Sequence, residues 1–223
     1  MQDSKIYNSS SFFETEEGEI DARFTDFSDM PCRRQWLCLK RVKRFGQWWV
    51  VKGVNPEFEP RSKAQEKLDH EFERGMTLWH PSLARMIAQQ EVPGMEGRCI
   101  IEEWVDGMSL DAFLATEPSL EARQDISAQL VEAVRYYMSK GVAHGNLKSS
   151  NVLITHNGAR VKLIDFDPEA VESQSDFAAL ALLLRQLQLP HKFNKVIKRC
   201  EKGKYATGEK LHQDFAETTK RRR

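Results

Sequence analysis

The sequence predicts an α+β protein of two lobes, in which a strand-rich first half is followed by a helical second half. Residues 33–105 combine short β-rich segments with a single helical pattern, whereas the chain from Ser109 onward is mainly helical in its apolar spacing. The polar motifs lie near the junction of the two halves. Because ligands favour crevices between lobes, we expect the functional site at this junction.

The first half contains a predicted hairpin, one helix and two further strands. Residues 33–54, RRQWLCLKRVKRFGQWWVVKGV, place β-rich segments on both sides of the turn KRFGQ, which is typical of an antiparallel hairpin. Residues 63–79 predict a helix that ends before Pro81, because the residue preceding a proline disfavours the helical region. Strands at 83–92 and 98–105 complete an antiparallel sheet.

The second half is predicted to be built around one buried helix. Residues 119–141 form an amphipathic helical pattern that stops at a glycine suited to a helix C-cap. Residues 151–164 indicate a short hairpin, since their Asn-Gly pair favours a tight turn. Residues 172–189 are apolar on most sides and predict the central helix, and two more helices are expected at 192–202 and 207–218.

We therefore divide the chain into three parts. Residues 1–30 are polar and acidic and are expected to form a flexible N-terminal arm, residues 31–105 the first lobe, and residues 106–223 a shortened second lobe. The arm has no basic patch followed by an apolar stretch, and the longest apolar run is too short to cross a bilayer. The expected location is the cytoplasm, without membrane contact.

The charge balance and the cysteines limit the classes of partner. The chain has 33 basic and 33 acidic side chains, so its net charge is zero and nucleic acid is not an expected partner. The basic end KRRR is expected to be a solvated terminus. Four cysteines without paired spacing indicate free thiols in a reducing compartment. The remaining expectation is a protein partner, which the sequence does not identify.

Six motifs occur in a fixed order, and together they resemble a protein kinase from about Arg34 to Phe215. A single match of this kind would be weak, but the order and the spacing of the set are specific. The motifs are VVK (50–52), Glu71 in the following helix, IIEEWVDG (100–107), HGNLKSSN (144–151), IDFD (164–167) and the pair Ser175-Asp176. The resemblance implies a bilobal kinase-like fold with a β-rich N-lobe and a helical C-lobe.

The resemblance also assigns roles in phosphate and metal binding. Lys52 would hold the α- and β-phosphates of ATP, and Glu71 would hold Lys52. Asp165 and Asn151 would supply oxygen ligands for Mg²⁺, a hard cation. Lys148 would reach the transferring phosphoryl group. ATP and Mg²⁺ are therefore the expected cofactors.

Four further residues are assigned to the adenine side of the same site. Val50 shares a strand face with Lys52 by alternation and would pack on adenine from above. By resemblance, Leu153 would form the floor, and the Glu103 carbonyl and the Val105 N–H would make the hinge hydrogen bonds.

Two departures from the kinase pattern concern catalysis and phosphate binding. Asn146 stands at the position of the aspartate that accepts the proton of the substrate hydroxyl, and an amide cannot accept that proton at neutral pH. General-base help is worth roughly 10²–10⁴-fold in rate, so its loss cripples transfer. In addition, FTDFSDMPCRRQW before the hairpin contains no glycine, which disfavours close approach of the backbone to phosphates.

Two more departures concern the back of the pocket and the substrate platform. Glu102 falls at the gatekeeper position, where its carboxylate could compete with nucleotide phosphates for Lys52. Only ten residues separate Asp165 from Asp176, which leaves no room for an activation segment with its A-P-E motif. Asp176 itself is expected to bond the backbone of the catalytic loop from below.

Three functions are compatible with these residues. The preferred interpretation is a pseudokinase with weak or no phosphoryl transfer, acting as an ATP-binding or protein-interaction module. An active atypical serine/threonine kinase is the first alternative, because a lysine two residues past the base position is the serine/threonine pattern. A small-molecule phosphotransferase of the aminoglycoside or choline kinase type is the second, although only 47 residues follow Asp176.

Overall fold

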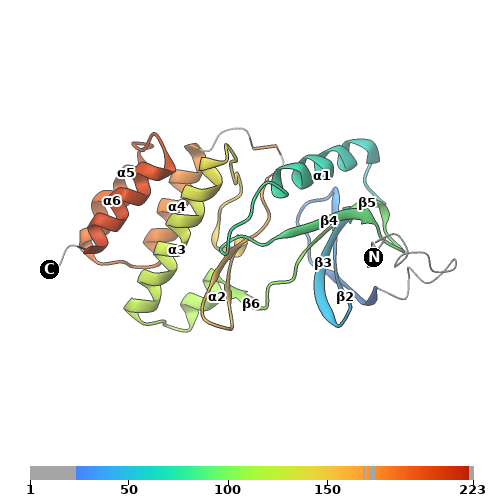
Figure 1. Cartoon of the computed structure of the whole chain (residues 1–223), viewed down its shortest axis with the longest axis horizontal. Helices are drawn as coiled ribbons and strands as arrows, with labels where there is room; N and C mark the ends of the chain where they lie inside the picture. Colours follow the sequence, from blue (N-terminus) through green and yellow to red (C-terminus); the bar gives the residue numbers. More distant parts are fainter. Residues whose placement is uncertain (1–23, 168, 171–173, 221–223) are drawn as a thin grey trace, which may run out of the picture.

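The N-lobe is a five-stranded antiparallel sheet with one helix against it, and the C-lobe is mainly helical (Figure 1). The computed structural model describes residues 24–167, 169–170 and 174–220. The predicted α+β fold of two lobes is confirmed. The strands of the large sheet are β1 (Thr25–Met30), β2 (Leu37–Arg44), β3 (Gln47–Val54), β4 (Met86–Glu91) and β5 (Glu96–Glu103), in the order β1-β2-β3-β5-β4.

The β2–β3 hairpin places the Lys52 strand at the centre of this sheet. Phe45 and Gly46 form its two-residue turn, both with positive φ, as the predicted hairpin requires. Val51 points into a small core with Phe24 and Val42. Its neighbours in β3 therefore face the other side of the sheet, toward the C-lobe.

Helix α1 (Arg61–Gly75) packs on the sheet and carries Glu71. Ala64 and Leu68 are buried in a cluster with Ile100 and other residues of the sheet. The prediction that the helix continues to residue 79 is wrong. After Gly75 the chain leaves the helix in turns, and Trp79 is 71% exposed, so the apolar spacing there did not indicate a buried helical face.

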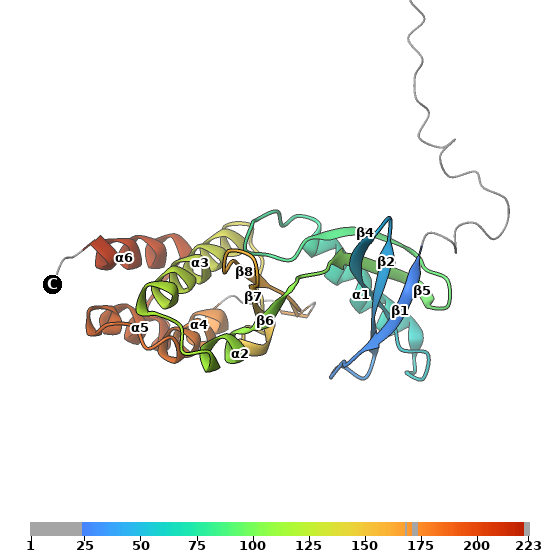
Figure 2. The ribbon, with the colours of Figure 1, turned by 90° about the horizontal axis from the view of Figure 1, so that it is seen from below.

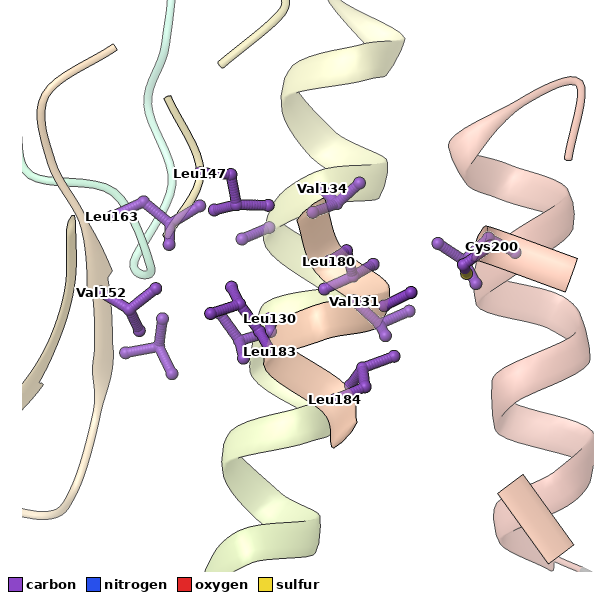
Figure 3. Close-up of a cluster of buried hydrophobic side chains, with 14 of the residues drawn as sticks. Leu130, Val131, Val134, Leu147, Val152, Leu163, Leu180, Leu183, Leu184 and Cys200 are labelled. Carbon is purple, nitrogen blue, oxygen red and sulfur yellow. The ribbon is translucent and has the colours of Figure 1, made fainter. Parts of the chain in front are cut away.

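The C-lobe is organised around α4, as expected from its apolar composition. In Figure 3, Leu180 and Leu184 of α4 meet Leu130 and Val131 of α3, with Cys200 of α5 on the far side. The elements are β6 (Gly107–Ser109), α2 (Leu110–Ala115), α3 (Leu120–Ser139), β7 (Val152–Thr155), β8 (Val161–Leu163), α4 (Gln174–Gln186), α5 (Asn194–Glu201) and α6 (Gly208–Lys220).

Helix α3 begins and ends at the residues that the sequence indicated. The Ser119 hydroxyl accepts a hydrogen bond from the Ala122 N–H and caps the first turn. Gly141 has φ of +71°, and the Val142 N–H donates to the Tyr137 carbonyl, which closes a Schellman motif. The chain then runs directly into the loop that contains Asn146.

The boundary of the predicted N-terminal arm needs a correction. Residues 1–23 lie outside the described part of the chain, but Thr25–Met30 pairs with β2 as an edge strand instead of belonging to a loose arm. The polar composition of this segment hid the strand, since four of its six residues are polar or acidic and edge strands tolerate them. Within the described residues, no helix combines the length and apolar character needed to cross a bilayer.

Candidate functional site

The first group of site residues is a buried ion cluster in the N-lobe. The Lys52 ammonium lies 2.7 Å from a Glu71 carboxylate oxygen and 2.8 Å from one of Glu102. Strand β3 supplies the lysine, α1 supplies Glu71, and β5 supplies Glu102. All three residues are 5% exposed or less. The structure thus brings Lys52 into contact with both carboxylates.

One ammonium therefore serves two buried carboxylates. Burial disfavours the charged ammonium, but the neighbouring Glu102 and Glu71 outweigh this effect and raise the pKa of Lys52. Burial also raises the pKa of Glu102, despite the lysine beside it. We infer that Lys52 stays charged and that burial favours the protonated form of Glu102. A nucleotide phosphate at Lys52 would meet Glu102 at the same ammonium.

The second group joins the two lobes through Arg34. This residue lies in the loop between β1 and β2, where the kinase family has its glycine-rich loop. Its guanidinium lies 3.0 Å from Asp165 Oδ1, 3.7 Å from Glu71 Oε2 and 3.4 Å from the Phe166 carbonyl. A cation of the protein thus contacts the carboxylate that the resemblance assigns to Mg²⁺.

The other oxygen of Asp165 is held by amides. Asn146 Nδ2 donates to Asp165 Oδ2 at 2.6 Å, and Asn151 Nδ2 donates to the Asn146 carbonyl at 2.8 Å and to Oδ2 at 3.4 Å. Mg²⁺ requires oxygen ligands in near-octahedral geometry. Here both carboxylate oxygens are engaged, and both amides present N–H groups. The residues as arranged do not fit Mg²⁺, and the described residues contain no cluster of three or more His, Cys, Asp or Glu suited to a metal.

The loop around Asn146 is held from below by Asp176, as predicted. The Asp176 carboxylate accepts hydrogen bonds from the His144 N–H at 2.7 Å and from the Gly145 N–H at 2.9 Å. Burial raises the pKa of Asp176. The His144 ring stacks on Phe166 at 4.2 Å, and burial lowers the pKa of His144 to about 3, so the ring is neutral at pH 7. The catalytic-loop frame is intact.

The predicted roof of the adenine site carries a charge that sequence reasoning missed. Val50 lies on β3 as expected, but its partner across the hairpin is Arg41, which faces the same side. The Arg41 guanidinium lies 4.2 Å from the Trp48 ring centroid and 5.3 Å from that of Trp104. A cation stacked between two indoles replaces an apolar surface above the hinge.

The remaining predicted residues divide between the hinge and the solvent. Glu103 ends β5, and its carboxylate pairs with Lys162 at 2.8 Å, while Val105 is buried and its N–H donates to no described backbone group. Leu153 is half-buried on β7. Lys148 is exposed and forms no ion pair with a described residue.

Arg34 and Arg41 are the site residues that the sequence interpretation overlooked. The signal for Arg34 was the Arg33-Arg34 pair inside a loop that lacks glycine. For Arg41 the signal was its position opposite Val50 in the predicted hairpin, because cross-strand partners share a face.

Comparisons with known proteins identify the family to which the sequence and the fold correspond. The sequence pattern of the protein kinase domain matches residues 38–179, more than half of the chain. The serine/threonine/tyrosine-protein kinase HT1 of Arabidopsis thaliana is 31% identical over 120 residues, which cover 52% of this chain and 30% of that protein. A probable serine/threonine-protein kinase of Streptomyces coelicolor, SCO3848, is 26% identical over 127 residues, or 55% of this chain and 19% of that protein.

The solved structures show the same fold over a larger part of the chain. The crystal structure of the Mycobacterium tuberculosis PknI kinase domain superposes with a TM-score of 0.68 at 18% identity, covering 88% of this chain and 96% of that one. The curated relatives are much longer, since the match spans about a third of their length or less. The shared sequence pattern and the bilobal architecture lead to one conclusion: the chain belongs to the protein kinase family.

Proposed function

We propose that this protein is a pseudokinase that works as a protein-interaction module and does not use Mg²⁺-ATP. The observation that carries the proposal is the ion pair between Arg34 and Asp165, at 3.0 Å. The family uses this aspartate to hold the metal that neutralises the phosphates. Here an arginine of the same chain neutralises it, so Mg²⁺ would have to displace a guanidinium that also faces Glu71.

The chemistry of the catalytic loop supports the same proposal. Asn146 donates an N–H to Asp165 and has no carboxylate with which to accept a proton from a substrate hydroxyl. Only ten residues connect Asp165 to Asp176, so the chain lacks the length for the peptide-substrate platform of protein kinases. This chain therefore departs from active kinases in three features: the proton acceptor, the metal ligand and the platform for the peptide substrate.

The contacts between the lobes suit a rigid scaffold. Besides the Arg34 pair, Lys67 pairs with Glu169 at 2.9 Å, and Arg74 donates to the Ala170 carbonyl at 2.6 Å. These three contacts tie the N-lobe to the segment that follows Asp165. Kinases open and close their lobes during turnover. Polar contacts that hold one lobe arrangement favour a constant surface for a protein partner.

One observation favours the alternative of an active atypical kinase. The ion pair between Lys52 and Glu71, at 2.7 Å, is a contact that kinases need for transfer. The same ammonium, however, also binds Glu102 at 2.8 Å, and the adjacent aspartate is occupied. The ion pair between Lys52 and Glu71 is therefore expected in an active kinase and also in an inactive protein that must pair a buried charge.

Restoring the missing carboxylate separates the two functions. The experiment compares autophosphorylation and ATP hydrolysis of the wild type and of Asn146→Asp in the presence of Mg²⁺. For an active kinase, the variant should gain roughly 10²-fold or more in rate. We expect no transfer in either protein, because the aspartate does not release Asp165 from Arg34. Transfer in the wild type, or a gain in Asn146→Asp, would refute the proposal.

A further inference from the structure

A basic cavity lies at the end of the C-lobe that is remote from Lys52 and Asp165. Its volume is about 510 Å³, and its lining comes from α5 and the residues just before and after this helix. Helix α5 lies at the far end of the molecule from β1 (Figure 2). Its lining consists of cationic and amide side chains: His191, Lys192, Asn194, Lys195, Lys198, Arg199, Lys202 and Lys204. Among the residues that the structure describes, no carboxylate belongs to this lining.

The sequence of α5 separates its two faces by helical spacing. Val196, Ile197 and Cys200 are buried in the C-lobe core. Lys195, Lys198 and Lys202 recur at i, i+3 and i+7 on the outer face and are exposed. Gly203 has φ of +58° and ends the helix in a Schellman motif, which turns Lys204 back toward the same cavity.

Four lysines of this region have no ion-pair partner among the described residues. Residues 191–204 hold six basic and one acidic side chain, although the whole chain has no net charge. The acidic residue, Glu201, pairs with Arg185, and Arg199 pairs with Asp214. No ion pair with a described residue is made by four lysines of the cavity, namely Lys195, Lys198, Lys202 and Lys204. Like charges at this spacing repel one another along a helix, so an anionic partner would relieve that repulsion.

The lining points to the carboxylates of a polypeptide. No Phe, Tyr or Trp lines the cavity, so it offers no surface for stacking the bases of a single-stranded nucleic acid. None of the large apolar side chains that the structure exposes belongs to it, so it has no group to insert into a membrane. Lysines are flexible point charges that bind carboxylates without demanding one geometry.

The same chain contains a segment with the complementary charge. Residues 14–21, ETEEGEID, carry five carboxylates and no basic side chain, which equals the net positive charge of residues 191–204. This segment ends three residues before Phe24 in the N-lobe, whereas α5 lies at the opposite end of the C-lobe (Figure 1). We propose that the cavity beside α5 binds residues 14–21 of a second copy of this chain, in a head-to-tail contact.

Analytical ultracentrifugation of the full chain tests this inference without involving nucleotide. We expect the average mass of the wild type to rise with protein concentration at 50 mM salt. The dissociation constant should increase roughly tenfold or more at 0.5 M salt, because screening weakens exposed charge pairs. The variant Lys195→Glu/Lys198→Glu/Lys202→Glu should remain monomeric. The matched control Lys63→Glu/Lys140→Glu/Arg160→Glu changes as many exposed charges elsewhere and should associate like the wild type.

A charge exchange completes the test and does not depend on α5 alone. The variant Glu14→Lys/Glu16→Lys/Glu17→Lys leaves every described residue unchanged and should also be monomeric. Mixed with the α5 variant, it should form a complex, because its basic segment meets a cavity that is now acidic. A wild type that stays monomeric at every concentration overturns the inference, as does unchanged association of the Glu14→Lys/Glu16→Lys/Glu17→Lys variant. Both results would leave the proposal for the nucleotide cleft unaffected.

Discussion

Removing the Arg34 guanidinium tests whether its ion pair with Asp165 keeps Mg²⁺ from binding there. Arg34→Ala deletes a cation that contacts Asp165 at 3.0 Å and faces Glu71 at 3.7 Å. It leaves two carboxylates without their shared partner and frees one side of Asp165. The variant should therefore be less stable than the wild type without ligand, and it should respond to Mg²⁺.

The size of the effect follows from the burial of the pair. The side chain of Arg34 is 18% exposed and that of Asp165 is 30% exposed. Exposed pairs contribute about 0–1 kcal/mol, whereas breaking a fully buried pair costs about 3–5 kcal/mol. We expect an intermediate loss of about 1–3 kcal/mol in the free energy of unfolding. For a chain of this size, that loss lowers Tm by roughly 2–12 °C.

Urea unfolding with and without 10 mM Mg²⁺ provides the assay, and Arg33→Ala is the matched control. Arg33 is the preceding residue, is exposed and makes no ion pair with a described residue, so its loss should change stability by less than about 0.5 kcal/mol. Arg34→Ala should regain part of its stability in Mg²⁺, whereas the wild type and the control should not. Equal stability of the two variants, or no Mg²⁺ response in Arg34→Ala, would refute the reasoning.

Three further predictions concern the buried charges. Because the pKa of Glu102 is raised, the native state binds its proton more tightly than the unfolded chain, and stability falls as pH rises above about 4.5. Glu102→Gln removes that loss, so its stability relative to the wild type should increase from pH 4.5 to 8; a constant difference in urea titrations would be inconsistent with the raised pKa. Lys52→Met removes the ion-pair partner of Glu102 and leaves Glu71 with Arg34 alone, at 3.7 Å, so it should lower the free energy of unfolding by about 3–5 kcal/mol, as measured by thermal unfolding. Asp176→Asn turns an amide toward two backbone N–H groups and should cost about 1–3 kcal/mol in urea unfolding, and an unchanged midpoint would argue against its role in holding the loop.

The sequence was informative where the signal was local or periodic. The Gly141 cap, the hairpin around Gly46 and the apolar composition of α4 predicted these elements because each depends on neighbouring residues. The spacing of Lys52 and Glu71 predicted their contact, because a strand followed by a helix brings them together in this family. The local pattern gave a wrong prediction at Trp79. Its apolar spacing predicted a helix, but the residue lies exposed after the helix has ended.

The contact between Arg34 and Asp165 could not be predicted from the spacing of the motifs. Arg34 and Asp165 are far apart in sequence, and they meet only because the two lobes dock with the β1–β2 loop between them. A residue in a loop has no periodicity that reveals its direction. The count of glycines in that loop indicated poor phosphate binding, but the docked structure was needed to identify the group that takes the place of the metal.

We claim that Asp165, paired with Arg34, does not hold Mg²⁺ for ATP. Thermal unfolding of the wild type in millimolar ATP, with and without Mg²⁺ and with Asp165→Ala as the control, tests this claim. A ligand at 100 times its dissociation constant stabilises a fold by about 2.7 kcal/mol. For this chain length, such binding would raise Tm by roughly 5–11 °C. We expect no Mg²⁺-dependent rise in Tm for the wild type. A rise that depends on Mg²⁺ and disappears in Asp165→Ala would contradict this expectation, because Asp165 would then hold a metal despite Arg34.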